Sequence, residues 1–226
     1  MTTWIRVARY HLVDPIAYLV GPWAILAFVF LVNLVITAVQ GGPNPTKALA
    51  VVFLYFFAIG ILSISRSLPF GLALGVSRRS YYTGTVLLVA GLAAVDGLAL
   101  TLLQVAERAT GGWGLSLHFF QVSFILAGPW DLTWLTSSVG LVLLFLYGQW
   151  FAIVRRRWNA FGTVAFIIGQ VAVIRVGIVL ATPTHGRTSV GSFLATLTPA
   201  RLTGVLAAIA ALLIIGGLAI VRRVTV

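Results

Sequence analysis

Two ionisable residues, Asp96 and Arg175, lie inside long apolar stretches of the sequence. A charged side chain at the centre of a membrane helix costs about 2.5–3.5 kcal/mol unless it finds a partner. Asp96 follows Arg79 by seventeen residues. Arg175 follows Arg157 by eighteen, so two helices leaving the same membrane surface would carry the charges to nearly the same depth. We therefore expect an ion pair, which either locks two helices together or lines a transport pathway or its gate.

A second candidate region, RSLPFGLALGVSRRSYYTGT, runs from Arg66 to Thr85 between two apolar stretches. Its composition predicts a short helix, a turn at Gly75 and a new helix that is capped by Ser77. Its apolar side chains are unusual for a loop that carries arginines and indicate contact with a partner protein. The alternative is that its Pro, Gly and Arg residues serve only turn formation and orientation. The candidate contact residues are Leu68, Pro69, Phe70, Leu72, Leu74, Val76, Arg78 and Arg79.

The remaining polar residues predict neither a metal site nor a catalytic centre. His11, His118 and His185 are expected on different sides of the membrane, and the chain has no cysteine. The phosphate-binding pattern GxxxxGK[ST] and the nucleophile pattern GxSxG are both missing from the sequence. Glu107 is expected to form a surface ion pair with its neighbour Arg108. We therefore expect no cofactor bound by this chain.

Six apolar stretches would position these residues. Hydrophobic residues make up 60% of the chain and charged residues 8%, so little remains for a water-soluble domain. Each stretch is about long enough for a membrane-crossing helix, which needs about 20 apolar residues. We expect an all-α polytopic membrane protein with a single transmembrane domain over residues 1–226, in which Gln104, Gln149 and Gln170 hydrogen-bond between helices. The six stretches cover residues 16–39, 48–65, 81–105, 132–154, 160–181 and 202–221.

The distribution of lysine and arginine predicts the orientation. Ten of these residues lie in the two termini and in the second and fourth loops, against four in the other loops. By the positive-inside rule both termini face the cytoplasm, residues 66–79 form a cytoplasmic loop and residues 106–131 an extracytoplasmic loop of a protein in the cytoplasmic (inner) membrane. A seventh crossing at residues 115–130 would place the later arginines on the outer side of the membrane. The marginal length of this stretch and its polar residues favour an interfacial or re-entrant segment instead. The net charge of +11 thus indicates membrane orientation and not nucleic-acid binding.

Residues 1–15 predict an N-terminal interfacial helix. Trp4 and other apolar residues share one side at helical spacing, whereas Arg6 and Arg9 share another. An Asp-Pro pair then ends the segment before the first crossing. The segment is either a membrane anchor or a docking element. The polar, basic start of the chain predicts no cleavable signal peptide.

An amphipathic N-terminal segment, six crossings, and the inner pattern of Ser-Arg-Arg, an aromatic pair and Gly-Thr at residues 77–85 resemble the membrane (permease) subunit of an ABC-2 type exporter. The resemblance implies that residues 68–76 form a docking helix for a separate ATPase subunit, which would bind ATP and Mg²⁺. It also implies a homodimer or heterodimer of membrane subunits, so the chain would not be an enzyme by itself. The family often has an acidic residue at the start of this inner region, where this sequence has Arg66-Ser67.

Two other functions fit the sequence less well. One is a stand-alone secondary transporter that uses Asp96 as a proton site, and the other is an intramembrane enzyme. Secondary carriers commonly contain two related halves, and residues 1–110 and 111–226 show no repeat. Catalysis requires titratable groups that lie together, and the four acidic residues are scattered along the chain. The exporter subunit is therefore the leading interpretation.

Overall fold

The structure is a computed structural model of the 226-residue chain, and it describes residues 16–40, 44–45, 49–121, 128–181 and 198–221. Within these ranges the chain is almost entirely helical, which confirms the all-α fold. Five helices in the described part are long and apolar enough to cross a membrane, and they support a multi-pass membrane protein. These candidate spans are Tyr18–Gln40, Ala50–Ala73, Arg78–Ala109, Trp130–Gly177 and Pro199–Ile220.

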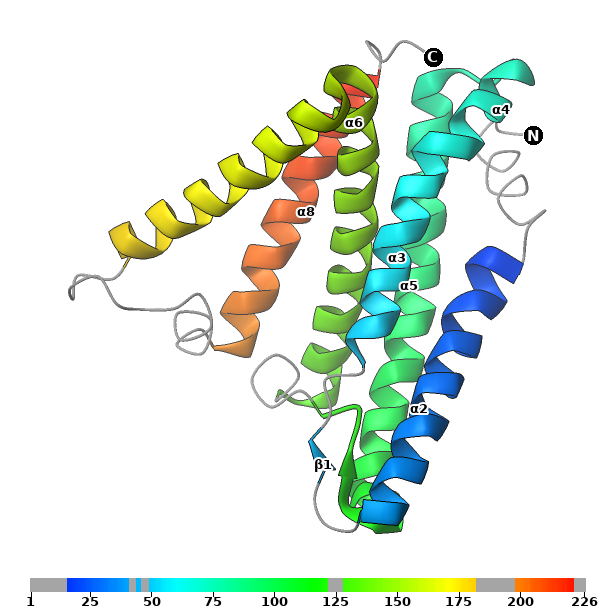
Figure 1. Cartoon of the computed structure of the whole chain (residues 1–226), viewed down its shortest axis with the longest axis vertical. Helices are drawn as coiled ribbons and strands as arrows, with labels where there is room; N and C mark the ends of the chain where they lie inside the picture. Colours follow the sequence, from blue (N-terminus) through cyan, green and yellow to red (C-terminus); the bar gives the residue numbers. More distant parts are fainter. Residues whose placement is uncertain (1–15, 41–43, 46–48, 122–127, 182–197, 222–226) are drawn as a thin grey trace.

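The first two helices run in opposite directions at one side of the bundle (Figure 1). A π-helical turn, η1 (Ile16–Val20), leads into α2 (Gly21–Gln40). The returning helix α3 (Ala50–Leu62) continues through a second π-helical turn, η2 (Ser63–Ser67), into α4 (Leu68–Ala73). Helical dihedral angles at both junctions make α3, η2 and α4 one continuous helix. The second span therefore extends beyond its predicted end.

A tight turn separates α4 from α5 (Arg78–Ala109). Gly75 has a φ of 79°, in the left-handed region that glycine adopts without steric cost. Ser77 then caps α5, because its Oγ accepts a hydrogen bond from the backbone N–H of Ser80 at 3.2 Å. The predicted turn and cap are confirmed, whereas the predicted short helix is the last part of the helix that begins with α3.

The far end of α5 leads into a compact segment. Glycines with positive φ, among them Gly111 and Gly112, turn the chain through η3 (Gly112–Ser116) into β2 (Leu117–His118). The short strand β2 pairs in parallel with β1 (Asn44–Pro45) and so ties this segment to the loop after α2. The described part of the predicted extracytoplasmic loop therefore folds against the end of the bundle.

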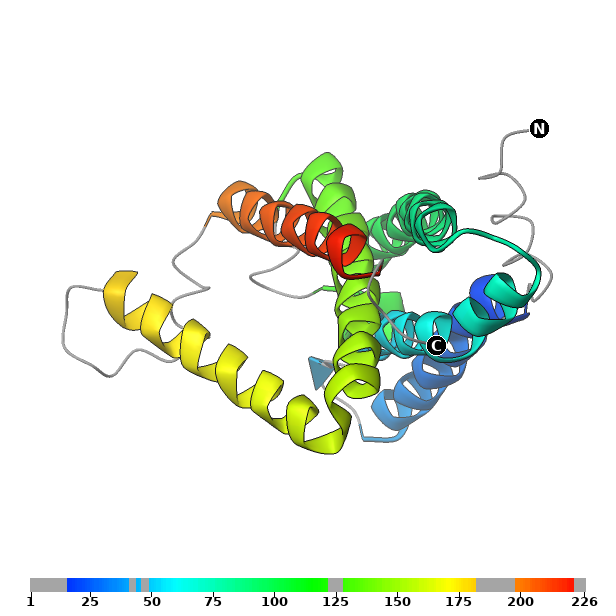
Figure 2. The ribbon, with the colours of Figure 1, turned by 90° about the horizontal axis from the view of Figure 1, so that it is seen from above.

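The element α6 (Trp130–Ala181) contains two predicted crossings, 132–154 and 160–181. Its course changes at Asn159, whose φ of 56° and ψ of −156° are not helical. The residues before Asn159 form a first arm inside the bundle, and those after it form a second arm that slopes away (Figures 1 and 2). If the break at Asn159 separates two crossings, the five candidate spans correspond to the six predicted crossings. The number of crossings and the side of each terminus stay predictions.

The first arm of α6 is the centre of the packing, since α3, α5 and α8 (Pro199–Val221) all contact it. Glycines allow the approach of α3. A Cβ at Gly60 would overlap the carbonyl oxygen of Phe145, and a Cβ at Gly148 would overlap that of Phe57. The two helices therefore meet backbone to backbone, as membrane helices do where small residues line their interface.

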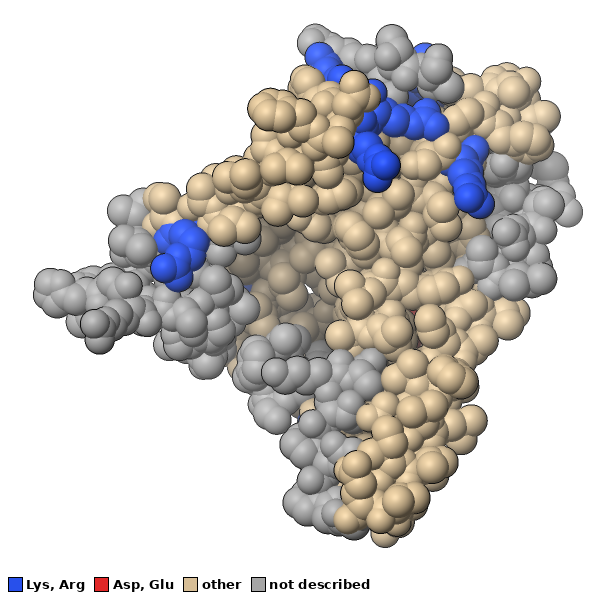
Figure 3. Space-filling model, viewed as in Figure 1, with Lys and Arg blue, Asp and Glu red and all other residues tan. Residues whose placement is uncertain are grey.

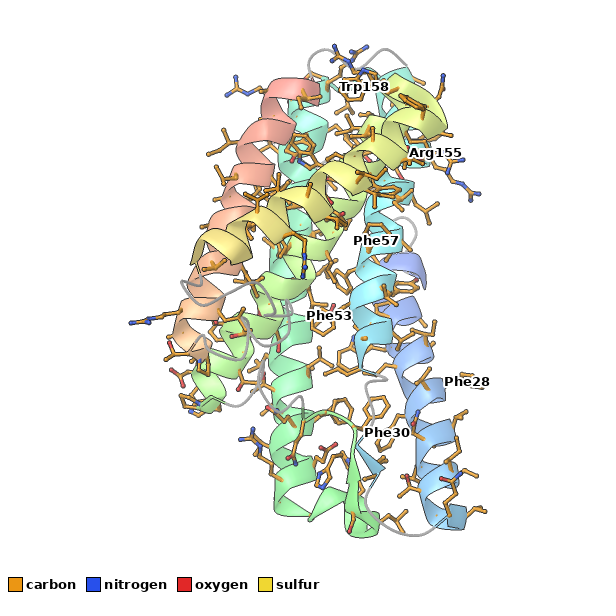
Figure 4. The ribbon with its side chains drawn as sticks, turned by 60° about the vertical axis from the view of Figure 1, so that its left-hand side comes forward. Phe28, Phe30, Phe53, Phe57, Arg155 and Trp158 are labelled. Atoms are coloured by element: carbon orange, nitrogen blue, oxygen red, sulfur yellow. The ribbon has the colours of Figure 1, made fainter. Side chains whose placement is uncertain are left out.

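Aromatic rings hold the start of the second arm of α6 against the first arm. Phe57 points from α3 toward α6 (Figure 4) and lies 5.7 Å from Tyr147 between ring centroids. The rings of Tyr147 and Phe151 each lie 6.3 Å from Phe166 on the second arm. Tyr147 also donates a hydrogen bond to Gln170. The two arms are therefore joined over about three turns beyond the break.

Six described arginines lie at the end of the bundle where α4 and the turn of α6 are found (Figure 3). We call this the arginine-rich end. The described acidic residues lie elsewhere: Asp96 within α5, Glu107 near its far end, and Asp131 at the start of α6. A membrane protein with this end in the cytoplasm would show the same asymmetry. The six residues are Arg66, Arg78, Arg79, Arg155, Arg156 and Arg157.

Candidate functional site at the arginine-rich end

The predicted contact helix α4 has an inner face that belongs to the protein core. Leu68 is fully buried, and Leu72 and Val76 are half-buried. These side chains pack with Tyr81 of α5 and Ile153 of α6. Three of the apolar residues that indicated a partner contact are therefore used to hold α4 on the bundle.

The opposite face of α4 is more exposed to solvent. Phe70 is 55% exposed and Leu74 is 62% exposed. Arg66 lies one helical turn before Phe70, and Ala73 lies beside Leu74; both are exposed as well. Because these four residues follow helical spacing, they share one side of the helix. We call Arg66, Phe70, Ala73 and Leu74 the docking face.

A polar network, buried at Tyr81 and Gln149 and exposed at Arg156, fixes the base of α4. Tyr81 donates its hydroxyl proton to the carbonyl oxygen of Ser63 at 2.8 Å. The side-chain amide of Gln149 lies 3.3 Å from Ser63 Oγ. Arg156 donates from Nη2 to the carbonyl oxygen of Ser65 at 2.7 Å. Residues of α5 and α6 thus hold the π-helical turn η2 from two sides, and the predicted hydrogen bond of Gln149 between helices is confirmed.

The two arginines that begin α5 differ in their surroundings. Arg79 is exposed and Arg78 is half-buried, next to the cap residue Ser77. Pro69 is half-buried at the second residue of α4, where it offers no backbone N–H to the preceding turn η2. The predicted contact residues therefore divide into an exposed set and a set that supports it.

Asp96 lies in the middle of α5 and is only 7% exposed. Its Oδ1 accepts a hydrogen bond from the indole Nε1 of Trp23 in α2 at 3.0 Å. Its Oδ2 is buried and has no hydrogen-bond partner among the described residues. The partner that the structure gives to this carboxylate is therefore an indole of α2.

The structure does not bring Arg175 to Asp96. Arg175 is exposed on the second arm of α6, which slopes away from the bundle. The sequence predicted the two charges at equal depth in the membrane, and charges at equal depth meet only if their helices are neighbours. Because α6 changes course at Asn159, the helices that carry Asp96 and Arg175 are not neighbours. An ion pair between the two residues is thus not part of the described fold.

The prediction of a surface ion pair at Glu107 is wrong. Glu107 is fully buried, and its Oε2 accepts hydrogen bonds from the backbone N–H groups of Phe119 at 3.0 Å and Phe120 at 2.9 Å. The indole of Trp113 adds a third at 3.3 Å. The carboxylate therefore anchors the segment after η3 to α5, and Phe30 of α2 packs on the same three rings.

Several predicted positions fall outside the described residues. These include the interfacial segment 1–15 with Trp4, Arg6 and Arg9. Within the described ranges, His, Asp and Glu side chains form no group of three or more that could hold a metal ion. The docking region and the two residues Asp96 and Arg175 are therefore the parts of the predicted site that the structure describes.

Sequence reasoning missed the roles of Trp23, Glu107 and Arg156. A tryptophan in an apolar stretch carries no sign that its N–H meets a carboxylate 73 residues away. Arg156 lies in a run of three arginines, and the positive-inside rule explained this run without any further role for Arg156. For Glu107, the one available signal in the sequence was that glycines and aromatic residues follow it. Such a segment can fold back onto the end of the helix and bond to the carboxylate.

No protein-family model matches this chain, and neither curated proteins nor solved structures give a match.

Proposed function

We propose that this chain is the membrane (permease) subunit of an ATP-driven exporter of the ABC-2 type, working in the cytoplasmic membrane with a separate ATPase subunit. The observation that carries the proposal is the docking face of α4. It presents Phe70 and Leu74 to the outside at the end of the molecule where six arginines gather. A second membrane subunit, identical or similar, would complete the exporter.

The position of the docking face supports a protein partner over lipid. Exposed apolar side chains along the spans, such as Phe28, which points away from the bundle in Figure 4, suit contact with acyl chains. Phe70 and Leu74 lie beyond Arg66 along the same helix, by about 6 Å and 12 Å at the usual rise. If Arg66 lies at the headgroup level, these two side chains reach the headgroups and the water. Exposed apolar groups at such a level are typical of protein contact sites.

The chemistry of transport would then be divided between subunits. The chain lacks the GxxxxGK[ST] pattern that holds the phosphates of ATP, so the partner would bind ATP and Mg²⁺. Hydrolysis would move the partner, and the docking face would pass the movement to the membrane helices. This chain would bind no cofactor and catalyse no reaction by itself.

Phe70→Ala tests the proposal. Truncation of a central aromatic contact typically costs about 2 kcal/mol or more, which is roughly a thirtyfold loss of affinity. We expect Phe70→Ala to release the ATPase subunit during purification while the membrane subunit stays folded. Phe28→Ala is the matched control, because Phe28 is 67% exposed on a span and should leave the ATPase bound. Equal release by both variants would contradict the docking role of α4.

A second candidate function is a proton-coupled secondary transporter. The observation in its favour is Asp96, a nearly buried carboxylate with one oxygen that lacks a partner in the described chain. If the protein purifies without an ATPase and transports its substrate on a proton gradient alone, and Asp96→Asn stops that transport, this function replaces the exporter.

A further inference from the structure

The π-helical turn η2 is where three elements of the bundle meet. The backbone N–H of Leu68 bonds to the carbonyl oxygen of Ser63, five residues back. Single π-helical turns inside α-helices are often found at functional sites. Here the turn connects the transmembrane helix α3 to the docking face of α4, and Tyr81 of α5 and Gln149 of α6 hold Ser63 from the side.

The carbonyl of Ser65 has an unusual hydrogen-bond donor. In a regular α-helix it would accept from the N–H four residues later, but that residue is Pro69, which has no N–H. Arg156 of α6 donates to this oxygen from Nη2 at 2.7 Å. A charged donor at this distance makes one of the stronger hydrogen bonds in proteins. A side chain of α6 thus supplies the donor that the proline lacks.

Arg156 also lies next to the point where α6 changes course. Asn159 follows it by three residues, and Trp158 packs so closely on Gly162 of the second arm that a Cβ there would overlap it. The bond to Ser65 therefore joins the base of the docking helix to the turn between the two arms of α6.

The neighbouring arginines have other surroundings. Arg157 lies over the ring of Trp158, 5.0 Å from its centroid. Arg155 is exposed and points away from the bundle in Figure 4, and it makes no hydrogen bond or ion pair with the described residues. Of the three, Arg156 is the one that bonds to the helix α3–η2–α4 in the described part of the chain.

We propose that Arg156 is a positioning residue that ties α4 to the turn of α6, so that the docking face and the second arm move as one unit. This proposal rests on the proposed function for one point only, namely that an ATPase subunit moves α4. The tie itself belongs to the membrane subunit alone. It can therefore be tested on the isolated protein.

The test is a distance measurement between two spin labels. Because the chain has no cysteine, labels can be placed at Leu74→Cys on the docking face and Phe161→Cys on the second arm, both well exposed. In lipid nanodiscs the parent protein and Arg155→Gln should give one narrow distance distribution. Arg156→Gln should broaden it, with the tied population reduced about tenfold or more relative to untied states. A distribution for Arg156→Gln that equals that of Arg155→Gln overturns the proposal.

A rescue variant separates the tie from general damage to the fold. Pro69→Ala offers the Ser65 carbonyl a backbone donor but does not tie α4 to α6. Pro69→Ala with Arg156→Gln should therefore keep the broad distribution, and it should restore a single gel-filtration peak if Arg156→Gln alone has lost it. A narrow distribution for the double variant would mean that the missing donor, and not the lost tie, caused the broadening, and it would overturn the proposal. Loss of the ATPase subunit from purified parent protein would instead contradict the proposed function and leave these distances unchanged.

Discussion

The carboxylate of Asp96 depends on Trp23 for its one hydrogen bond within the described chain. Trp23→Phe keeps the ring but removes the donor, and a buried acceptor without a donor costs about 1–3 kcal/mol or more. We expect a lower midpoint of thermal unfolding in detergent, followed by circular dichroism. Adding Asp96→Leu to Trp23→Phe should recover most of the loss, because both partners are then apolar.

Arg175→Gln is the matched comparison for this prediction. Arg175 is exposed on the second arm and does not contact Asp96 in the described fold, so its replacement should change the unfolding midpoint little. A loss as large as that of Trp23→Phe would mean that the sequence-based ion pair forms between subunits or in another conformation.

The crossing of α3 and α6 depends on glycine in both helices. Gly148→Ala would place a Cβ on the carbonyl oxygen of Phe57, and forcing extra atoms into a packed interface typically costs about 1–3 kcal/mol. Gly91→Ala in α5 meets no atom within 4 Å and should be neutral or stabilise the helix by up to about 1 kcal/mol. The fraction of each variant that survives heating in detergent, measured by gel filtration, compares the two. Equal survival would contradict the close crossing.

Helix positions were readable from the sequence because length and apolarity alone mark a membrane helix. The turn at Gly75 and the cap at Ser77 were readable because each rests on local backbone chemistry. The faces of the helices were not, since lipid and the bundle interior are both apolar and the same Leu or Val suits either. The arm beyond Asn159 was predicted at the right positions in sequence but not in space, because its direction depends on contacts such as that of Tyr147 with Phe166, which apolar composition does not reveal.

On the scale of the whole molecule, the clustered arginines predict which surface faces the cytoplasm. Ala109→Cys and Ala160→Cys place exposed thiols at opposite ends of the bundle in this cysteine-free chain. In intact cells, an impermeant thiol reagent should label the first and spare the second. Ala200→Cys, exposed at the start of α8, should be labelled like Ala109→Cys if α6 crosses twice. Labelling of Ala160→Cys from outside would reverse the orientation.

The bond between Arg156 and Ser65 also orders events during synthesis. The two residues are 91 positions apart, so a ribosome adding about 5–20 residues per second makes Arg156 roughly 5 to 20 s after Ser65. Throughout that interval α4 is already present but lacks its tie to α6. Under the proposed function, a partner that recognised the tied helix could therefore bind only after the first arm of α6 has been made, and subunit assembly would wait until then.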